Sequence, residues 1–387
     1  MAASKPDRRV KVLIALEGVI GGALRHLDLL LRHTDPEQFD LHLAVSARRS
    51  AHVREDFRRW REAGWAVHEI EMRREASPPA DLRALAALVA LCRRERFQVV
   101  HTHCAKAGFL GRPAGRIWGA RTVHTPHVFP FSHDFPRARR ALYLRLERLA
   151  ARWTDRFIML TEYQRNLLLQ HRLAPAERAV VVPNGIEPDE FGREDQASAR
   201  AALGLAGGAA VALFAGRFTE QKGSDVLLEA ARLLQARGAG PVVVAVGEGP
   251  QERRLREQIE LHRLGDRVLL RGWSDKMPLY YAACDLVVMP SRAEGLPYVV
   301  LEAKAAARPV LASLVCGMEE LIEHGRDGWL VPPQNPEALA RLLAELCADR
   351  AELAAAGRRA REGLRPEWHA DAWAARIHGI YRELASG

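Results

Sequence analysis

Apolar residues follow two periods along this chain. Short apolar runs, such as VKVLIALEGV (10–19) and FDLHLAVS (39–46), are typical of strands buried in a parallel sheet. Between such runs apolar residues recur every three or four positions, as in DLRALAALVALCRRERF (81–97), and this spacing predicts amphipathic helices. Strands and helices that alternate in this way predict an α/β fold with doubly wound parallel sheets.

This alternation occurs twice in the chain. A polar stretch rich in Gly and Ala (192–209) lacks core patterning, and a strand, loop and helix follow directly after it. A chain of 387 residues is long enough for two full cores. We therefore predict an N-terminal domain over 1–188 and a C-terminal domain over 205–367, both Rossmann-like, and a final amphipathic helix at about 368–387.

Composition narrows the class of protein. Hydrophobic residues make up 48% of the chain, and no apolar stretch approaches the roughly 18 residues of a membrane span. The charged start runs directly into a strand-like segment, which predicts that there is no signal peptide. The five cysteines are scattered without metal-ligand spacing, which is typical of a reducing compartment, so we expect a cytoplasmic protein.

Positive charge is concentrated in the first half of the chain. Residues 1–185 contain 32 Lys and Arg against 19 Asp and Glu, whereas residues 186–387 contain 25 against 29. The most basic segment (138–157) is predicted to be an amphipathic helix with Leu, Tyr and Trp on its apolar side. Its Arg residues either form a solvated face or contact anionic headgroups or a diphosphate lipid, and both interpretations stay open.

Two carboxylates flank the start of one predicted helix, in SRAEGLPYVVLE (291–302). This segment follows CDLVVMP (284–290), a predicted buried strand, so the helix presents free backbone N–H groups to an anion. Glu302 lies roughly 8 Å further along the helix axis, and Glu294 lies in the loop. A nucleotide sugar has both a phosphate for the helix end and hydroxyls for the carboxylates. The alternative is an ordinary strand–loop–helix with two surface glutamates.

A second loop carries two cations. Arg217 and Lys222 follow the predicted strand AAVALFA and precede Gly223 and a predicted helix. Two cations beside a helix N-terminus are suited to a diphosphate. Arg and Lys in any solvated loop would look similar, but the Gly-Arg-x4-Lys-Gly spacing after a buried strand is more specific.

Five histidines gather at the ends of two predicted strands and in the loop after the second. A metal site is one interpretation, although no carboxylate or cysteine pair shares metal-ligand spacing with them. Substrate contact is the other interpretation, because open α/β sheets bind ligands at the ends of their strands. These residues are His101, His103, His124, His127 and His133.

A glycine-containing turn follows the first predicted strand. Gly18, Gly21 and Gly22 do not have the spacing of a dinucleotide fingerprint. A plain tight turn and a close approach of a ligand to the backbone both stay open.

Taken in order, these motifs resemble those of the retaining GT-B glycosyltransferases, in particular glycosyltransferase family 4. The order is Gly-Arg-x4-Lys-Gly (216–223), Gly-Glu-Gly-Pro (247–250), Glu-x7-Glu (294–302) and Gly-x2-Glu-Leu-Ile (317–322). The stretch from His103 to Phe131 resembles the acceptor side of bacterial exopolysaccharide and lipid-carrier members, and Pro183–Phe191 resembles their hinge.

The resemblance implies two Rossmann-like domains that face a cleft, with the C-terminal helix crossing back to the N-terminal domain. It implies transfer of a sugar, with retention, from a nucleotide diphosphate donor to a glycan or polyprenyl-linked acceptor in cell-surface polysaccharide synthesis. We expect UDP as the nucleotide, and no metal or other cofactor.

The resemblance also assigns site residues. His127 is expected to contact the donor sugar across the cleft from Glu294. The residues implied for catalysis are His127, Arg217, Lys222 and Glu294; for donor binding, Gly22, Gly216, Gly247, Gly272, Trp273, Gly295, Leu296, Pro297 and Glu302; and for the acceptor side, His103 and Lys106.

Three positions depart from the family pattern. Ala307 and Cys316 stand where the pattern usually has Gly, and Glu319 stands where it has Pro. These departures bear on the loop at 313–320, and hence on which donor sugar is selected.

Two other classes of protein stay open. A GT-B sugar-nucleotide epimerase would share the fold but would release an altered sugar nucleotide without an acceptor. A nucleic-acid-binding protein would explain the basic half, but no recognised binding motif accompanies the charge. We therefore expect a nucleotide sugar and a glycan or lipid-linked acceptor as partners, and no nucleic acid. If the basic helix binds anionic lipid, the protein would be peripheral at the inner face of the membrane.

Overall fold

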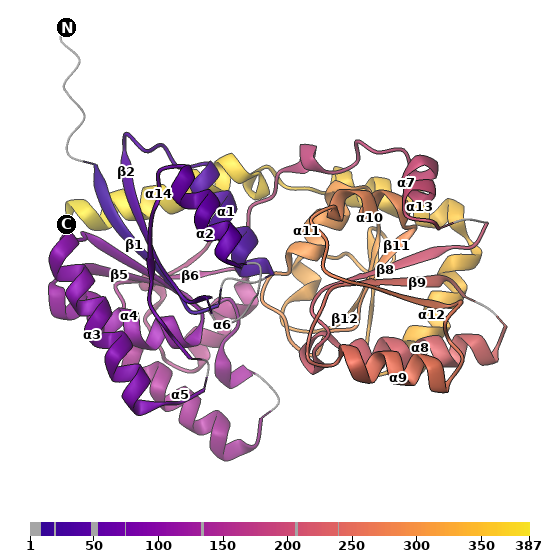
Figure 1. The fold of residues 1–387 in the computed structure, drawn as a ribbon, viewed down its shortest axis with the longest axis horizontal. Coiled ribbons are helices and arrows are strands. Elements are labelled where there is room, and N and C mark those ends of the chain that lie inside the picture. The colour runs from indigo at the N-terminus through magenta and orange to yellow at the C-terminus, as the bar shows by residue number, and fades with distance from the viewer. Residues whose placement is uncertain are drawn as a thin grey trace, which may run out of the picture. The chain divides into compact units, whose positions relative to one another are not determined.

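The computed structural model describes residues 9–18, 21–47, 53–73, 75–132, 135–205, 208–238 and 240–387. The chain divides into a first unit, Met1–Gly185 with Ala370–Gly387, and a second unit, Ile186–His369. Each unit has a parallel sheet covered by helices on both faces (Figure 1). The predicted pair of Rossmann-like domains is therefore confirmed.

The described part of the first unit contains a parallel sheet of seven strands. Its strands are β1 (Val10–Leu16), β2 (Phe39–Val45), β3 (Ala66–Glu69), β4 (Val99–His103), β5 (Arg121–Thr125), β6 (Arg156–Met159) and β7 (Ala179–Val181). Its helices are α1 (Gly22–Arg32), α2 (Val53–Glu62), α3 (Pro78–Glu95), α4 (Ala105–Trp118), α5 (Arg137–Ala151), α6 (Glu162–Gln170) and α14 (Ala370–Ser386).

The strand order of this sheet is β3-β2-β1-β4-β5-β6-β7, so the direction of winding reverses between β1 and β4. Ligands of open α/β sheets bind beyond the carboxyl ends of the strands at such a reversal. The register pairs Leu16 of β1 with His103 of β4, and His103 with Thr125 of β5. These three residues mark the edge at which a first-unit site would lie.

Helices cover both faces of the first sheet, which explains why β1 is apolar on both faces from Val12 onward. Every residue from Val12 to Leu16 is at most 1% exposed. The C-terminal helix α14, yellow in Figure 1, packs on β1, β4 and α1. It buries Trp373, Ile377 and Tyr381 completely. The predicted return of the C-terminal helix to the N-terminal domain is confirmed.

The described part of the second unit contains a parallel sheet of six strands. Its strands are β8 (Val211–Ala215), β9 (Val242–Val246), β10 (Val268–Arg271), β11 (Leu286–Met289), β12 (Val310–Ser313) and β13 (Gly328–Val331). Its helices are α7 (Gln196–Ala202), α8 (Ser224–Ala236), α9 (Glu252–Leu261), α10 (Met277–Ala283), α11 (Tyr298–Ala305), α12 (Pro336–Ala348) and α13 (Arg350–Glu362).

The order in this second sheet is β10-β9-β8-β11-β12-β13, with the reversal between β8 and β11. The apolar run at the start of the segment 309–333 predicts one strand followed by a loop, but the structure has two strands, β12 and β13. The second strand was missed because GWLV is short and follows a polar turn, so it shows neither a long apolar run nor a clear alternation.

The boundary between the units falls earlier than the polar stretch suggested. Residues 186–204 belong to the second unit, and Gln196–Ala202 form a helix within that stretch, capped by the side chain of Asp195. Ala199 is fully buried, and Arg200 forms an ion pair with Asp285 at 2.7 Å. A seven-residue helix has too few apolar positions to show a period, so its packing cannot be recognised from the pattern.

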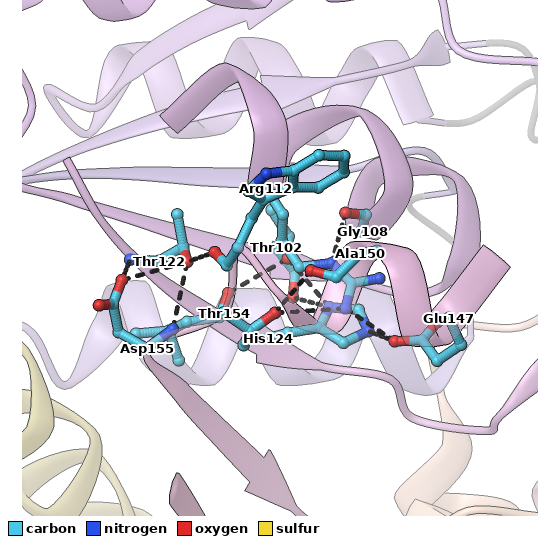
Figure 2. Close-up of polar contacts among 11 residues, drawn as sticks. Thr102, Gly108, Arg112, Thr122, His124, Glu147, Ala150, Thr154 and Asp155 are labelled. Carbon is cyan, nitrogen blue, oxygen red and sulfur yellow. Dashed lines mark hydrogen bonds and ion pairs between the residues drawn. The ribbon is translucent and has the colours of Figure 1, made fainter. Parts of the chain in front are cut away.

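Helix α5, the predicted basic helix, is held to α4 by a buried polar network (Figure 2). Arg112 Nη1 donates to Glu147 Oε1 at 2.7 Å, and Arg112 Nε donates to the Gly108 carbonyl at 2.7 Å. Glu147 is the one acidic residue of α5, and it is buried. No acidic residue of α5 therefore lies beside the arginines on the exposed face of this helix. Leu142 and Leu149 are exposed on that face, by 53% and 39%.

Within the described ranges, no helix has the length and apolar character to cross a membrane.

Candidate active site

An ion pair and a serine form the centre of the candidate site in the second unit. Lys222 Nζ donates to both carboxylate oxygens of Glu294, at 2.7 and 2.9 Å. Ser291 Oγ donates to Glu294 Oε1 at 2.6 Å. The side chain of Glu294 is 5% exposed, whereas that of Lys222 is 26% exposed. The structure therefore brings together two residues that the sequence predicted in separate motifs, and it adds Ser291.

Glycine allows the Lys222 loop to approach the end of β11. Lys222 ends a 3-10 turn, η5 (Glu220–Lys222), and Gly223 follows with φ +70° as the cap of α8. A Cβ at Gly223 would lie 1.9 Å from the Pro290 carbonyl oxygen. A larger residue would push Lys222 away from Glu294, so Gly223 is needed both for its dihedral angle and for its size.

A second close contact lies between the ends of β8 and β9. Gly247 has φ +147°, and a Cβ there would lie 2.1 Å from the carbonyl oxygen of Gly216. Arg217 follows directly and is partly buried. The predicted donor residues Gly216 and Gly247 thus bring two backbone segments together beside Arg217.

The remaining predicted donor residues follow β10 and β11. Gly295, Leu296 and Pro297 are buried between Glu294 and the first turn of α11, and Tyr281 Oη donates to Glu302 Oε2 at 2.7 Å. Gly272 and Trp273 follow β10, where Trp273 is 55% exposed. Glu302 therefore lies on α11 with Tyr281 as its hydrogen-bond donor, and an exposed indole follows the edge strand β10.

The loop that departs from the family pattern keeps a glycine-like backbone. Cys316 has φ +53° and Ala307 has φ +54°, in the left-handed region that L-residues usually avoid. Each such residue costs roughly 1–2 kcal/mol, which the surrounding structure must offset. Cys316 lies close to Glu294, and burial raises the pKa of its thiol. Both residues thus adopt the backbone conformation that glycine favours, and Cys316 adds a side chain beside Glu294.

Histidines form the corresponding centre in the first unit, at the reversal between β1 and β4. His103 Nδ1 and His127 Nε2 are 3.0 Å apart, and Gln164 Nε2 donates to the His127 carbonyl at 2.7 Å. His127 has φ +55°, which turns the chain sharply after β5. His26 of α1 contacts both rings edge-on, at centroid distances of 5.0 and 5.1 Å.

Burial keeps these histidines neutral. It lowers the pKa of His101, His103 and His127 well below the ordinary value of 6.5. It lowers that of His26 to about 4, although a hydrogen bond to Asn184 acts in the opposite direction. Neutral imidazoles supply hydrogen bonds but no charge, so this centre is suited to hydroxyl groups rather than to phosphate.

The two residues predicted for the acceptor side already have protein partners. Lys106 Nζ donates to both carboxylate oxygens of Asp81, at 2.8 Å each, and His103 is 2% exposed beside His127. Acceptor contact by Lys106 and His103 stays a prediction. Gly22 begins α1 after Gly21, whose φ is +56°.

Glu17 lies at this edge and was not predicted. Its carboxylate accepts from the backbone N–H groups of Lys106 and Ala107, at 3.4 and 3.1 Å, at the start of α4. Its position at the end of the first strand is the signal that would have indicated it, because strand ends carry ligand sites. Gln164 and His26, also not predicted, come from helices, where the sequence shows no such signal.

No metal centre is formed by the histidines that the structure describes. Nowhere in the described ranges do three or more His, Cys, Asp or Glu side chains come together in a way that could hold a metal ion. His133 lies outside the described residues.

The fold and these two centres define a GT-B glycosyltransferase. Residues 20–190 match the family described as Glycosyltransferase Family 4, and residues 195–363 match Glycosyl transferases group 1. A D-inositol 3-phosphate glycosyltransferase of Thermobispora bispora is 33% identical over 305 residues, which cover 74% of this chain and 71% of that protein. The chain belongs to the GT-B glycosyltransferases of family 4, and the prediction of a glycosyltransferase is confirmed.

Another curated relative covers more of the chain. The UDP-Gal:α-D-GlcNAc-diphosphoundecaprenol α-1,3-galactosyltransferase of Escherichia coli is 28% identical over 349 residues, or 88% of this chain and 87% of that protein.

Solved structures agree with the fold. HepE of Anabaena, in complex with UDP and glucose, has a TM-score of 0.81 at 21% identity, covering 97% of this chain and all of that one. Sucrose-phosphate synthase of Thermosynechococcus elongatus has a TM-score of 0.83 at 22% identity, covering 98% and 100%.

Proposed function

We propose that this protein transfers a sugar from a UDP-sugar, with retention of configuration, to a polyprenyl-diphosphate-linked glycan in cell-surface polysaccharide synthesis. The observation that carries the proposal is the cluster of Lys222, Glu294 and Ser291 at the end of β11. A buried carboxylate held by a partly exposed ammonium offers an acceptor for sugar hydroxyls next to a cation for phosphate.

The chemistry assigned to each side chain follows from where charge develops. When the bond between the sugar and UDP breaks, negative charge grows on the departing phosphate oxygen, and stabilising it is the main electrostatic task. Arg217, Lys222 and the N–H groups after Glu294 would do so. Glu302 would bind the ribose, and Glu294 would orient the sugar ring through its hydroxyls.

The acceptor's proton needs a base, and no second carboxylate is assigned to that role. An oxygen of the donor phosphate would take it as the new bond forms, so that the sugar is delivered on the face from which UDP leaves. Glu294 would then act by binding, not as a nucleophile. His127 is proposed to contact the donor sugar, as a neutral hydrogen-bonding group.

Support for the donor, the linkage and the acceptor comes from the E. coli relative, whose name gives UDP-Gal, an α-1,3 linkage and a diphosphoundecaprenol acceptor. An α product from an α-linked UDP-sugar corresponds to retention. That relative also matches over most of both chains, whereas the inositol phosphate enzyme matches about three quarters of this one.

The experiment that tests this function incubates the protein with a panel of UDP-sugars and a synthetic sugar-diphosphate-lipid acceptor, and follows UDP release. The expected result is UDP release that depends on the acceptor, with an α-linked product by NMR. Activity only with inositol 3-phosphate would overturn the assigned acceptor. A changed sugar nucleotide without any acceptor would indicate the epimerase instead, and tighter binding of a short duplex than of UDP would indicate a nucleic-acid protein.

We also propose that α5 contacts anionic lipid. The support is its exposed face, which carries arginines together with Leu142 and Leu149 while Glu147 is buried against Arg112. Attraction between such a face and anionic headgroups decays over roughly 8 Å at physiological salt. A protein bound through α5 would then meet a lipid-linked acceptor at the surface of the membrane that contains this acceptor.

Vesicle flotation tests the lipid contact. The protein should float with anionic vesicles, should not float with neutral ones, and should dissociate as salt rises. Arg145→Gln with Arg152→Gln should weaken flotation, whereas Arg253→Gln with Arg254→Gln, an equal loss of charge on the exposed face of α9, should not. Equal recovery for the two variants, or with the two kinds of vesicle, would refute the proposal.

A further inference from the structure

The hydrogen bond between His103 and His127 joins a strand to the loop that carries a proposed sugar contact. His103 Nδ1 and His127 Nε2 are 3.0 Å apart, and the two rings stack at 5.2 Å with an interplanar angle of 29°. Both imidazoles are neutral, because burial lowers the pKa of each well below its usual value. One ring must therefore donate to the other.

The ring of His103 is fixed by its neighbours. His101 lies against it at a centroid distance of 4.1 Å, and His26 contacts its edge at 5.0 Å. His101 is itself held on both sides, by Tyr381 Oη at Nδ1 (2.6 Å) and by Thr125 Oγ1 at Nε2 (2.9 Å). The orientation of His103 is thus set by α14 and β5 through His101.

The other nitrogen of His103 decides the direction of the bond. His103 Nε2 is buried and has no hydrogen-bond partner among the described residues. A neutral imidazole carries its proton on one nitrogen. If that proton were on Nε2, a buried N–H donor would be left without an acceptor, and such orphans are rarer than unpaired acceptors. The proton of His103 therefore lies on Nδ1 and is donated to His127 Nε2.

We propose that His103 is a positioning residue that sets the tautomer of His127. Because His127 Nε2 accepts, the proton of His127 lies on Nδ1, and His127 presents an N–H donor to an oxygen of the donor sugar. This inference rests on the proposed contact between His127 and the sugar. It gives His103 a different role from the acceptor contact that the sequence predicted.

The tautomer is measured directly, without any turnover. Long-range 1H–15N spectra of protein labelled at histidine, with the His127 signals identified from their loss in His127→Ala, report which nitrogen carries the proton. We expect a protonated Nδ1 and an unprotonated Nε2 at His127 in the wild type, and a mixture of tautomers in His103→Leu. A protonated Nε2 at His127 in the wild type would overturn the inference, whatever the activity.

Kinetics with a matched pair of variants test the consequence. The amide nitrogen of Asn stands two bonds from Cβ, as Nδ1 of His does, so His103→Asn can donate to His127, whereas the similarly shaped His103→Leu cannot. We expect kcat to fall about five- to tenfold in His103→Leu, the effect of one hydrogen bond, and to stay within about twofold in His103→Asn. KM for the UDP-sugar should change little in both.

The outcomes separate this inference from the proposed function. If His127→Ala lowers kcat but the Asn and Leu variants are equally impaired, the positioning role is refuted and the sugar contact stands. If His127→Ala keeps full kcat, the sugar contact falls and the proposal falls with it. Equal melting temperatures for His103→Asn and His103→Leu are the control that attributes the difference in kcat to the hydrogen bond.

Discussion

Arg112–Glu147 in the first unit and Lys222–Glu294 in the second are chemically alike but differently exposed. In both, the closest N–O distance is 2.7 Å and the side chain of the carboxylate is at most 6% exposed. The side chain of Arg112 is 0% exposed, whereas that of Lys222 is 26% exposed. An ammonium has three N–H groups and Glu294 takes two, so Lys222 can still reach a phosphate. Access to the cation separates a pair that holds helices together from a pair that can bind a ligand.

The largest effect is expected from Arg112→Met. It leaves the Glu147 carboxylate buried without its cation, because the ring of His124, whose Nε2 lies 3.9 Å away, is kept neutral by burial, which lowers its pKa well below 6.5. The free energy of unfolding should therefore fall by about 3–5 kcal/mol. Chemical denaturation measures the change. The double variant Arg112→Met/Glu147→Leu should recover much of the loss, because no charge is then left buried. A double variant as unstable as the single one would show that the pair is not what holds α5.

Acid should destabilise the first unit through its buried histidines. In the unfolded chain His26 has a pKa near 6.5, whereas in the folded protein burial lowers it to about 4. Below pH 6.5 the unfolded chain therefore binds a proton that the folded protein does not, so stability is lost as pH falls through this window. At pH 5, protonation of His26 in the unfolded chain lowers the free energy of unfolding by roughly 2 kcal/mol. Urea midpoints at pH 7 and pH 5 measure it, and His26→Gln should reduce the difference; an unchanged difference would contradict this account.

Lys222→Met should lower turnover, whereas Arg112→Met lowers the free energy of unfolding, because the Lys222–Glu294 pair is proposed to bind the donor. Turnover should fall at least about a hundredfold, the usual result of losing one group that stabilises the charged transition state, and Arg217→Ala should do the same. Arg256→Ala, which breaks the exposed pair with Glu252, is the control and should keep full activity. Near-normal turnover in Lys222→Met or Arg217→Ala would remove that residue from the proposed diphosphate contact.

The smallest effect is expected from removing divalent metal. If Arg217 and Lys222 supply the positive charge at the diphosphate, then EDTA should leave turnover unchanged. Rates before and after dialysis against the chelator give the answer. Activity that is lost in EDTA and restored by Mg²⁺ or Mn²⁺ would show that the second unit needs a metal beside its two cations.

The sequence by itself determined the fold class and indicated two residues of the second-unit cluster, Lys222 and Glu294. Apolar strand runs that alternate with amphipathic helices permit little besides doubly wound sheets, since both faces of a parallel sheet must be covered. The second-unit motifs are local: Lys222 with Gly223 and Glu294 with Gly295 each lie within one strand–loop–helix segment, so their residue types and spacing were readable. Short elements such as α7 and β13 could not be predicted from the sequence, because they have too few residues to show a period.

Only the tertiary structure decided which polar groups meet. His26, His103 and His127 come from α1, β4 and the loop after β5, and a linear pattern does not indicate which nitrogen faces which. Burial then decides their charge state, because desolvation depends on every neighbour in space. The same holds for the two ion pairs. The sequence does not show how exposed the side chains of Arg112 and Lys222 are, and their different roles arise from how much water the packed chain leaves around each.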